Sequence, residues 1–452
     1  MTTFMTNLRA RYAQRREHWA WYLYDFGNSA YAAVVLLAVY SAYFQNQVVG
    51  GANGTRLWGN SVGIAMLVVA ILAPILGSLA DFSGRKKRFL LYLTTITILF
   101  TAAMYFVQEG DILLGMVVFI LAEIGYRGGQ VFYNSLLPEI AAPEEISTVS
   151  GKGWAIGSLG GIVCLIIVLA LILTIGGTEI VRLSFIITAI FFALSALPLF
   201  FIVDEKTKAQ EMPPGENTFS ITFKRLGETI RSVRQYGEFL KFMLAFLIYN
   251  DGILMALNFA AILGAVLFGM EQQQLIIFMI IVQAASVAGA YIFGIVGQRR
   301  GFRTALTQSL LLMIIAVIAI FFNTTITGFF MIGALAGFAL TGVQSVSRAL
   351  IGTFAPAGKS AEFYGFFAVA GRTSSFIGPT IFGNLVAILS ARLIASGMNE
   401  ALAEQSSHRW AVLSIAAFLV AGMALLMLVD EKEGRRQGQA ATQPGAAVEA
   451  QA

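Results

Sequence analysis

A short charged segment between two long apolar runs constrains this chain more than any other feature. Residues 77–88 end in four consecutive cations, Arg85-Lys86-Lys87-Arg88, with an apolar run over 57–79 before them and another over 89–107 after them. Each run is long enough to cross a membrane as a helix, for which about 20 residues suffice. Because the segment leaves room for only a tight turn, both helices end at the same membrane face. Its cations indicate that this face is cytoplasmic.

The composition excludes a soluble protein. Of the 452 residues, 57% are hydrophobic and 12% are charged, against about 45–50% and 25% in soluble domains. The net charge of +5 does not indicate a nucleic-acid partner, because the cations cluster beside apolar runs. Cys164 is the only cysteine, and His18 and His408 lie far apart, so neither a disulfide nor a metal site is expected.

Apolar runs alternating with charged breaks predict an all-α integral membrane protein with twelve transmembrane helices. The hydrophilic stretch 204–238 divides the predicted helices six and six. The predicted organisation is a cytoplasmic N-terminal segment at 1–18, a six-helix bundle at 19–203, a cytoplasmic loop at 204–238, a second six-helix bundle at 239–430 and a disordered cytoplasmic tail at 431–452. The predicted helices span 19–46, 57–80, 89–107, 112–137, 153–175, 181–203, 239–268, 273–297, 304–322, 327–353, 364–391 and 410–429.

The distribution of Lys and Arg predicts the orientation. With the N-terminus inside, the inside segments hold 23 of the 30 cations and the outside loops hold 4. The remaining three, Arg127, Arg348 and Arg372, fall within predicted helices. A bias of this size predicts that both termini are cytoplasmic.

The two halves of the chain echo each other in the same order. Residues 24–27, Tyr-Asp-Phe-Gly, parallel residues 249–252, Tyr-Asn-Asp-Gly, and the charged segment 77–88 has a weaker copy at 294–303. Gln298 stands in that copy where the first segment has an acid. The echo predicts a duplicated six-helix unit, an architecture used by secondary transporters.

The charged segment resembles the loop between helices 2 and 3 of the major facilitator superfamily, whose pattern is Gly-x-x-x-Asp-x-x-Gly-Arg-Lys/Arg. The matching residues are Gly77, Asp81, Gly84, Arg85 and Lys86. The resemblance implies two pseudo-symmetric six-helix bundles that transport by alternating access, with these five residues forming a cytoplasmic gate. Because Gln298 replaces the acid in the second copy, the first segment is expected to carry more of the gating energy.

A narrower resemblance is to the vacuole-effluxer, autophagy-related branch of that superfamily. Residues 24–31, Tyr-Asp-Phe-Gly-Asn-Ser-Ala-Tyr, are similar to its helix-1 signature, as are 133–140, 150–154 and 249–252. The usual helix-1 form has Trp-Ala where this chain has Phe-Gly. Fungal members of the branch are linked to export of amino acids from the vacuole, which implies amino acids as a substrate class. The implied location is the vacuolar membrane in a fungus or the cell membrane in a bacterium.

Ionisable side chains inside the predicted helices mark the candidate site, because each costs ~2.5–3.5 kcal/mol at the bilayer centre. Glu123 and Arg127 lie four residues apart, on one helix face and within side-chain reach. Two interpretations stand. The pair is static and neutralises two buried charges, or Glu123 exchanges its arginine partner for a proton during transport.

Asp25 and Asp251 occupy nearly equivalent places in helices 1 and 7. They either line the central cavity or make hydrogen bonds at helix ends and between helices. The Gly that follows each could let its helix bend or let a ligand approach the backbone. Arg372 is a candidate to bind a substrate carboxylate. The candidate cavity residues are Asp25, Asn28, Glu123, Arg127, Asn134, Asn250, Asp251 and Arg372.

These observations favour a secondary active transporter for an amino acid or a related small polar molecule or anion, coupled to protons. No nucleotide-binding motif occurs, so neither a cofactor nor an enzymatic activity is expected. The expected partners are the solute, protons and the lipid bilayer, and a monomer is expected. Two alternatives stay open: a non-transporting receptor or assembly factor on the same fold, and a lipid flippase.

Overall fold

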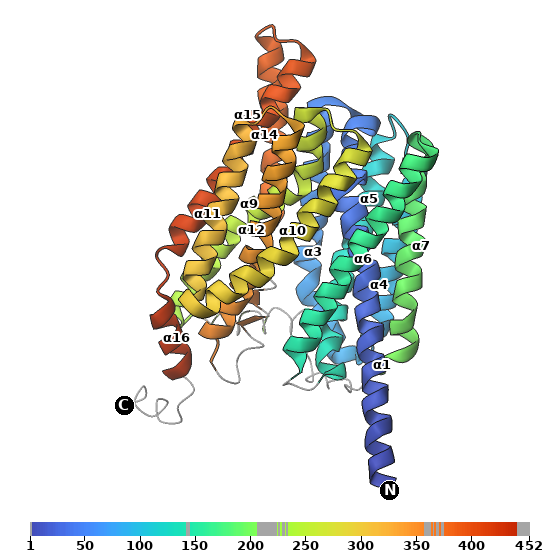
Figure 1. Cartoon of the computed structure of the whole chain (residues 1–452), viewed down its shortest axis with the longest axis vertical. Helices are drawn as coiled ribbons and strands as arrows, with labels where there is room; N and C mark the ends of the chain where they lie inside the picture. The colour runs from blue at the N-terminus through green and yellow to red at the C-terminus, as the bar shows by residue number, and fades with distance from the viewer. Residues whose placement is uncertain are drawn as a thin grey trace. The chain divides into compact units, whose positions relative to one another are not determined.

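The computed structural model describes residues 2–141, 145–205, 224, 227, 231, 234–356, 363–364, 366–367, 370–371 and 375–440. All regular structure in these residues is helical (Figure 1). The helices are α1 Thr2–Tyr31, η1 Ala32–Ala38, α2 Tyr40–Tyr43, η2 Phe44–Val49, α3 Gly51–Ser83, α4 Lys86–Ala103, η3 Met104–Phe106, α5 Ile112–Ile140, α6 Ile146–Ile175, α7 Thr178–Ile202, α9 Gly237–Phe268, α10 Gln272–Arg300, α11 Phe302–Phe322, α12 Ile326–Phe354, α14 Ile377–Ala395, α15 Glu400–Leu426 and α16 Glu431–Ala440.

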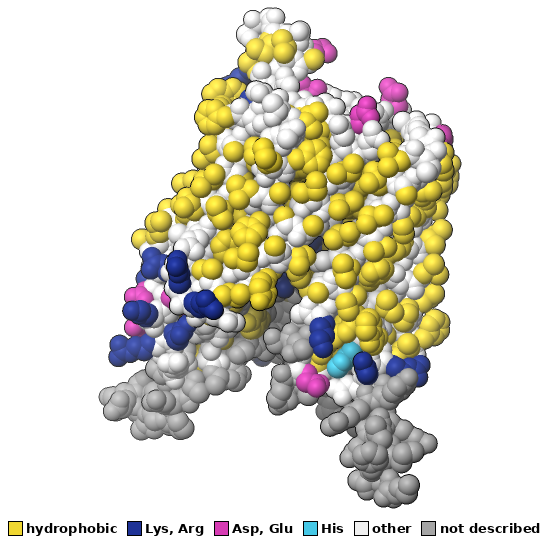
Figure 2. All heavy atoms as spheres, in the orientation of Figure 1, with side chains coloured by type: hydrophobic (Ala, Val, Ile, Leu, Met, Phe, Trp, Pro, Cys, Tyr) yellow, Lys and Arg dark blue, Asp and Glu magenta, His cyan; other side chains and the backbone are white. Residues whose placement is uncertain are grey.

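Twelve helical segments among the described residues are long and apolar enough to cross a membrane, which confirms the predicted fold class. Their outer faces carry large exposed apolar side chains, such as Phe201 at 80%, Leu113 at 76% and Phe322 at 73% exposure. Apolar side chains cover the visible sides of the helices (Figure 2). Such faces suit lipid tails, since a membrane helix satisfies its own backbone and can present apolar side chains to the bilayer.

The first span differs from the prediction. It runs over Gln14–Val49, longer than the predicted 19–46, because the cationic N-terminal segment continues the same helix. Within it, α1 gives way to the π-helical segments η1 and η2, which flank the single turn α2. π-Helical turns are rare and occur frequently at functional sites.

The chain divides into two compact units. Unit 1 comprises residues 1–50, 71–222 and 271–279, and unit 2 comprises 51–70, 223–270 and 280–452. The units differ from the predicted bundles at two places, since the first part of α3 belongs to unit 2 and the first part of α10 to unit 1. Most of the predicted loop 204–238 lies outside the described residues.

Small residues bring α3 into unit 2. A Cβ at Gly59 would clash with the carbonyl oxygen of Pro379, and one at Gly63 would clash with the hydroxyl of Thr380 on α14. The indole of Trp58 donates a 3.0 Å hydrogen bond to the carbonyl oxygen of Asn258 on α9. Glycines at helix contacts allow this close approach in membranes.

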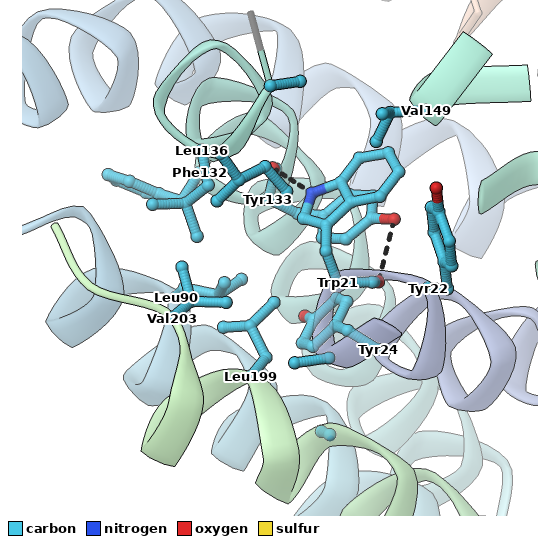
Figure 3. Packing of buried hydrophobic residues seen from close by; sticks show 14 of the residues in the cluster. Trp21, Tyr22, Tyr24, Leu90, Phe132, Tyr133, Leu136, Val149, Leu199 and Val203 are labelled. Carbon is cyan, nitrogen blue, oxygen red and sulfur yellow. Dashed lines mark hydrogen bonds between the residues drawn. The ribbon is translucent and has the colours of Figure 1, made fainter. Parts of the chain in front are cut away.

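An aromatic cluster forms the core of unit 1 near the start of its first span (Figure 3). The rings of Trp21 on α1 and Tyr133 on α5 are stacked, with centroids 4.4 Å apart and planes 7° apart. Each side chain also donates a 3.2 Å hydrogen bond to the other's backbone carbonyl. Leu90 of α4 and Leu199 of α7 pack beside them. Tyr133, which lies in a stretch that resembles the vacuole-effluxer branch, therefore holds α1 against α5.

Two predictions near the C-terminus are corrected. The eleventh span was predicted over 364–391, but the described residues form a turn at Ser375–Phe376 and α14 begins at Ile377. Pro379 fits there because a first-turn residue needs no helical N–H partner. The tail was predicted to be disordered from 431, yet residues 431–440 form α16, where Gly434 and Gly438 allow close contact with Phe354 of α12.

Candidate transport site

Two side chains, one from α1 and one from α5, bind the carboxylate of Glu123 in unit 1. Glu123 lies on α5 and is fully buried. Its Oε1 accepts a 2.7 Å hydrogen bond from Nε of Arg127, and its Oε2 accepts a 3.1 Å bond from the hydroxyl of Tyr31, the last residue of α1. The predicted ion pair is therefore present. Tyr31 is an additional partner that helical spacing could not reveal, because it comes from a different helix.

The guanidinium of Arg127 is oriented by an aromatic ring. Its Cζ lies 5.1 Å from the centroid of the Tyr126 ring, which itself packs against Tyr31 with centroids 4.7 Å apart. The Arg127 side chain is 25% exposed, whereas that of Glu123 is 0% exposed. Nε binds Glu123, and neither terminal nitrogen of Arg127 bonds a described residue. Those two nitrogens are therefore the part of the ion pair that can bind an anion.

Asp25 and Asn28 lie on α1 in the same unit. Asn28 is buried, with 3% exposure, whereas Asp25 is half-buried. The Asp25 carboxylate contacts Gly157 of α6 so closely that a Cβ at Gly157 would displace it. Asn134 is exposed on α5, and it makes no hydrogen bond to the described residues. Asp25 thus lies where α1 packs on α6.

The glycines after the two aspartates serve packing rather than bending. A Cβ at Gly27 would lie 2.9 Å from the Phe192 ring on α7. A Cβ at Gly252 would lie 3.0 Å from Cγ of Leu419 on α15. Both glycines are inside unbroken α-helix. Their small size lets a neighbouring helix approach closely.

Asn250 and Asp251 of α9 bracket the start of α14 in unit 2. The Asn250 amide donates a 3.4 Å hydrogen bond to the carbonyl oxygen of Gly371. Asp251 accepts a hydrogen bond from the backbone N–H of Gly378, in the first turn of α14. Adjacent side chains thus bind the backbone on both sides of the turn at Ser375–Phe376. Arg372 lies outside the described residues.

The charged segment 77–88 turns where the sequence places its second glycine. Gly84 has φ 58°, the left-handed conformation that glycine adopts without strain, and it ends α3. Gly77 and Asp81 lie in α3, where only their backbone is described. Arg85 precedes α4, and Lys86 is its first residue.

Lys86 makes a buried ion pair across helices. Its Nζ lies 2.6 Å from Oε1 of Glu139 at the end of α5, and both side chains are under 10% exposed. Nζ also donates a 3.4 Å hydrogen bond to the carbonyl oxygen of Ser135. Glu139 is within a stretch that resembles the vacuole-effluxer branch, but its partner could not be predicted, because Lys86 lies on a different helix. The pair joins the turn after α3 to the end of α5.

The same tetrapeptide follows the last span of each half, a repeat that the sequence analysis missed. Val-Asp-Glu-Lys occurs at 203–206 and again at 429–432. In unit 1, Oε1 of Glu205 accepts a 2.6 Å hydrogen bond from the backbone N–H of Lys87 on α4. The N–H of Asp204 donates a 3.4 Å bond to Glu17 of α1. These contacts connect α1, α4 and the end of α7.

Unit 2 repeats the arrangement. The carboxylate of Glu431 accepts hydrogen bonds of 3.2 and 2.8 Å from the backbone N–H groups of Phe302 and Arg303 at the start of α11. The N–H of Asp430 donates a 2.7 Å bond to Glu238 of α9. We call the two sets of contacts the end clamps. Each end clamp satisfies amide groups that a helix start leaves unpaired.

The second end clamp holds the end of the second charged segment. The second charged segment, 294–303, lacks an acid of its own, but Glu431 supplies a carboxylate to its last two residues. Asp430 in turn caps α16, and the backbone N–H groups of Glu433 and Lys432 hold the pKa of its carboxyl below the usual value. Glu431 is thus the counterpart of Glu205 in the first half, and each acid binds backbone N–H at the end of the charged segment of its own half.

The chain is similar to a family of effluxers and to an MFS-type transporter. The family model described as vacuole effluxer Atg22 like matches residues 57–439. The uncharacterized MFS-type transporter YxiO of Bacillus subtilis (strain 168) is 29% identical over 425 residues, covering 91% of this chain and 94% of that protein. Autophagy-related protein 22 of Yarrowia lipolytica is 22% identical over 348 residues, covering 70% of this chain and 56% of that protein.

Solved structures show the same fold. A bacterial homologue of the human lysosomal transporter Spinster, inward-facing and unoccupied, has a TM-score of 0.71 at 15% identity and covers 96% of this chain and 99% of its own. The nucleoside transporter NupG has a TM-score of 0.64 at 13% identity and covers 91% and 98%. The family match spans most of the chain and agrees with this fold. The chain therefore belongs to the Atg22-like vacuole effluxer family and is a transporter of the major facilitator type.

Proposed function

We propose that this chain moves a small solute bearing a carboxylate, an amino acid or a related anion, by alternating access coupled to protons. The observation that carries the proposal is the cluster of Glu123, Arg127 and Tyr31. A fully buried carboxylate there holds a guanidinium whose terminal nitrogens bond no described residue. Protonation of Glu123 weakens its attraction for Arg127, which frees the guanidinium for a substrate carboxylate.

The amino-acid class rests on the resemblance of residues 24–31, 133–140, 150–154 and 249–252 to the vacuole-effluxer branch, whose fungal members are linked to export of amino acids. In unit 1 the proposed cavity residues besides the cluster are Asp25, Asn28 and Asn134. In unit 2 they are Asn250, Asp251 and Arg372.

The remaining parts of the proposal concern the gate and the orientation. Gly77, Asp81, Gly84, Arg85 and Lys86 form a cytoplasmic gate, and the buried contact of Lys86 with Glu139 supports their role by fixing the turn to α5. Both termini face the cytoplasm, and the protein works as a monomer.

The test of the substrate class is thermal melting of the purified protein with amino acids, peptides, sugars, nucleosides and small anions. A ligand that binds only the folded state raises the melting temperature by mass action. We expect an amino acid or a related carboxylate to do so, and Arg127→Lys to abolish the shift. Arg182→Lys is the matched control, because Arg182 also pairs with a glutamate and lies over a tyrosine, but at an outer helix end. A shift caused only by uncharged solutes, or one that survives Arg127→Lys, would contradict the proposal.

A further inference from the structure

One oxygen of Asp251 is buried without a partner. Asp251 is 2% exposed, and its Oδ1 has no hydrogen-bond partner among the described residues. The carboxyl accepts one hydrogen bond, from the backbone N–H of Gly378 at the start of α14. An ionised carboxylate in this position would keep much of its charge uncompensated and out of water.

Glu123 and Asp251 are both buried carboxyls, but they differ in the groups that bind them. Glu123 receives a guanidinium on one oxygen and a hydroxyl on the other, which suits an anion. Asp251 receives a single amide and the partial positive charge of a helix start, which stabilise an anion less than a full cation does. Two buried carboxyls in one transporter therefore have environments that favour opposite protonation states.

Charged side chains on the neighbouring helices do not reach Asp251. The helices packed on α9 are α12, α14, α15 and α16, and Trp58 of α3 also contacts it. Among the described residues, α9's own Glu238 and Lys241 pair with each other, and α16 begins with Glu431, which caps α11. The other charged or histidine side chains described on these helices form no ion pair or hydrogen bond with Asp251, whose carboxyl is affected only by burial and by the Gly378 amide. They are Arg56, Arg348, Arg392, Glu400, Glu404, His408, Arg409, Lys432, Glu433, Arg435 and Arg436.

The surroundings of Asp251 also argue against a metal cation. Sodium and larger cations need several oxygen ligands, and the nearby Gly371 carbonyl already accepts from Asn250 and from the hydroxyl of Ser375. Within the described residues no cluster of acidic, histidine or cysteine side chains forms a metal site. A proton needs only the carboxyl itself.

We infer that Asp251 holds a proton at neutral pH, and that it is the proton-carrying group of the second half of the transporter. Its part in coupling rests on the proposed proton-linked transport, whereas its protonation does not. Because Asp251 binds an amide in the first turn of α14, a movement of α14 would change the surroundings of Asp251. A shift of α14 that removed the Gly378 amide or admitted water would change how tightly Asp251 holds its proton.

Infrared spectroscopy of the purified protein at neutral pH tests the protonation without any substrate. We expect a C=O stretching band of a protonated carboxyl, sensitive to exchange into D2O, that Asp251→Asn removes and Glu123→Gln leaves unchanged. Both substitutions are nearly isosteric, and melting curves check that each variant is folded. Absence of the band in the wild type, or its persistence in Asp251→Asn, would overturn the assignment.

A second measurement separates a proton from a metal cation. Melting temperatures are compared in sodium, potassium and choline chloride at equal ionic strength. We expect no difference among the salts. Stabilisation by sodium that disappears in Asp251→Asn would make Asp251 a sodium ligand and overturn the proton assignment. Failure to find any transported solute would instead contradict the proposed function and leave the infrared result standing.

Discussion

At the scale of single residues, the protein handles its buried charges by pairing. Taking an isolated carboxylate out of water costs several kcal/mol, and a buried pair is tolerated only when further hydrogen bonds satisfy it. Glu123 meets this condition through Arg127 and Tyr31. The spacing of four residues was enough to predict the ion pair. It could not predict Tyr31, because that contact depends on how α1 packs against α5.

The contribution of Tyr31 can be measured against a matched tyrosine in the same span. Tyr31→Phe removes a hydrogen bond to a charged acceptor and should cost about 1.5–3 kcal/mol of unfolding free energy. Tyr40→Phe removes a 2.8 Å bond to the neutral carbonyl of Gly115 and should cost about 0.5–1.5 kcal/mol. Chemical unfolding in detergent micelles compares the two. Equal losses, or a larger loss for Tyr40→Phe, would show that Glu123 is not an ionised acceptor.

At the scale of helices, apolar runs located the twelve spans but not their internal breaks. The eleventh span was predicted over 364–391, whereas a turn precedes α14, which begins at Ile377. Hydropathy averaged over a whole span is insensitive to such a turn, because the described part of the turn, Ser375–Phe376, is only two residues long. The end clamps were visible in the sequence as a repeated Val-Asp-Glu-Lys. Their role was not, since the amides that they bind lie more than a hundred residues away.

The second end clamp predicts that the first backbone amides of α11 are protected from hydrogen exchange. Glu431→Gln weakens the charge-assisted bonds to the amides of Phe302 and Arg303, so their hydrogen exchange should accelerate roughly tenfold. Glu433→Gln is the control, because that side chain is 45% exposed and pairs with Arg436 of α16 rather than with an amide of α11. Exchange measured by mass spectrometry on peptides covering the start of α11 gives the comparison. No change in Glu431→Gln, or the same change in both variants, would mean that the clamp does not hold α11.

At the scale of the whole molecule, duplication was predicted from short echoes, and the end clamps now extend it to equivalent contacts in each half. The composition of the compact units was not predictable. The first part of α3 joins unit 2 because Gly59 and Gly63 let α14 approach, and such packing has no signature in hydropathy. The identity of the solute could not be predicted from the sequence either, because a guanidinium such as that of Arg127 can bind many different anions.

The central claim is that solute movement and proton movement are coupled through Glu123. The most direct measurement uses proteoliposomes that contain a pH-sensitive dye, to which the solute found by thermal melting is added. The account predicts that the solute changes the internal pH with wild-type protein. With Glu123→Gln it should not, while exchange of labelled solute across the membrane continues. Solute movement by the wild type without a pH change, or a full pH change with Glu123→Gln, would contradict it.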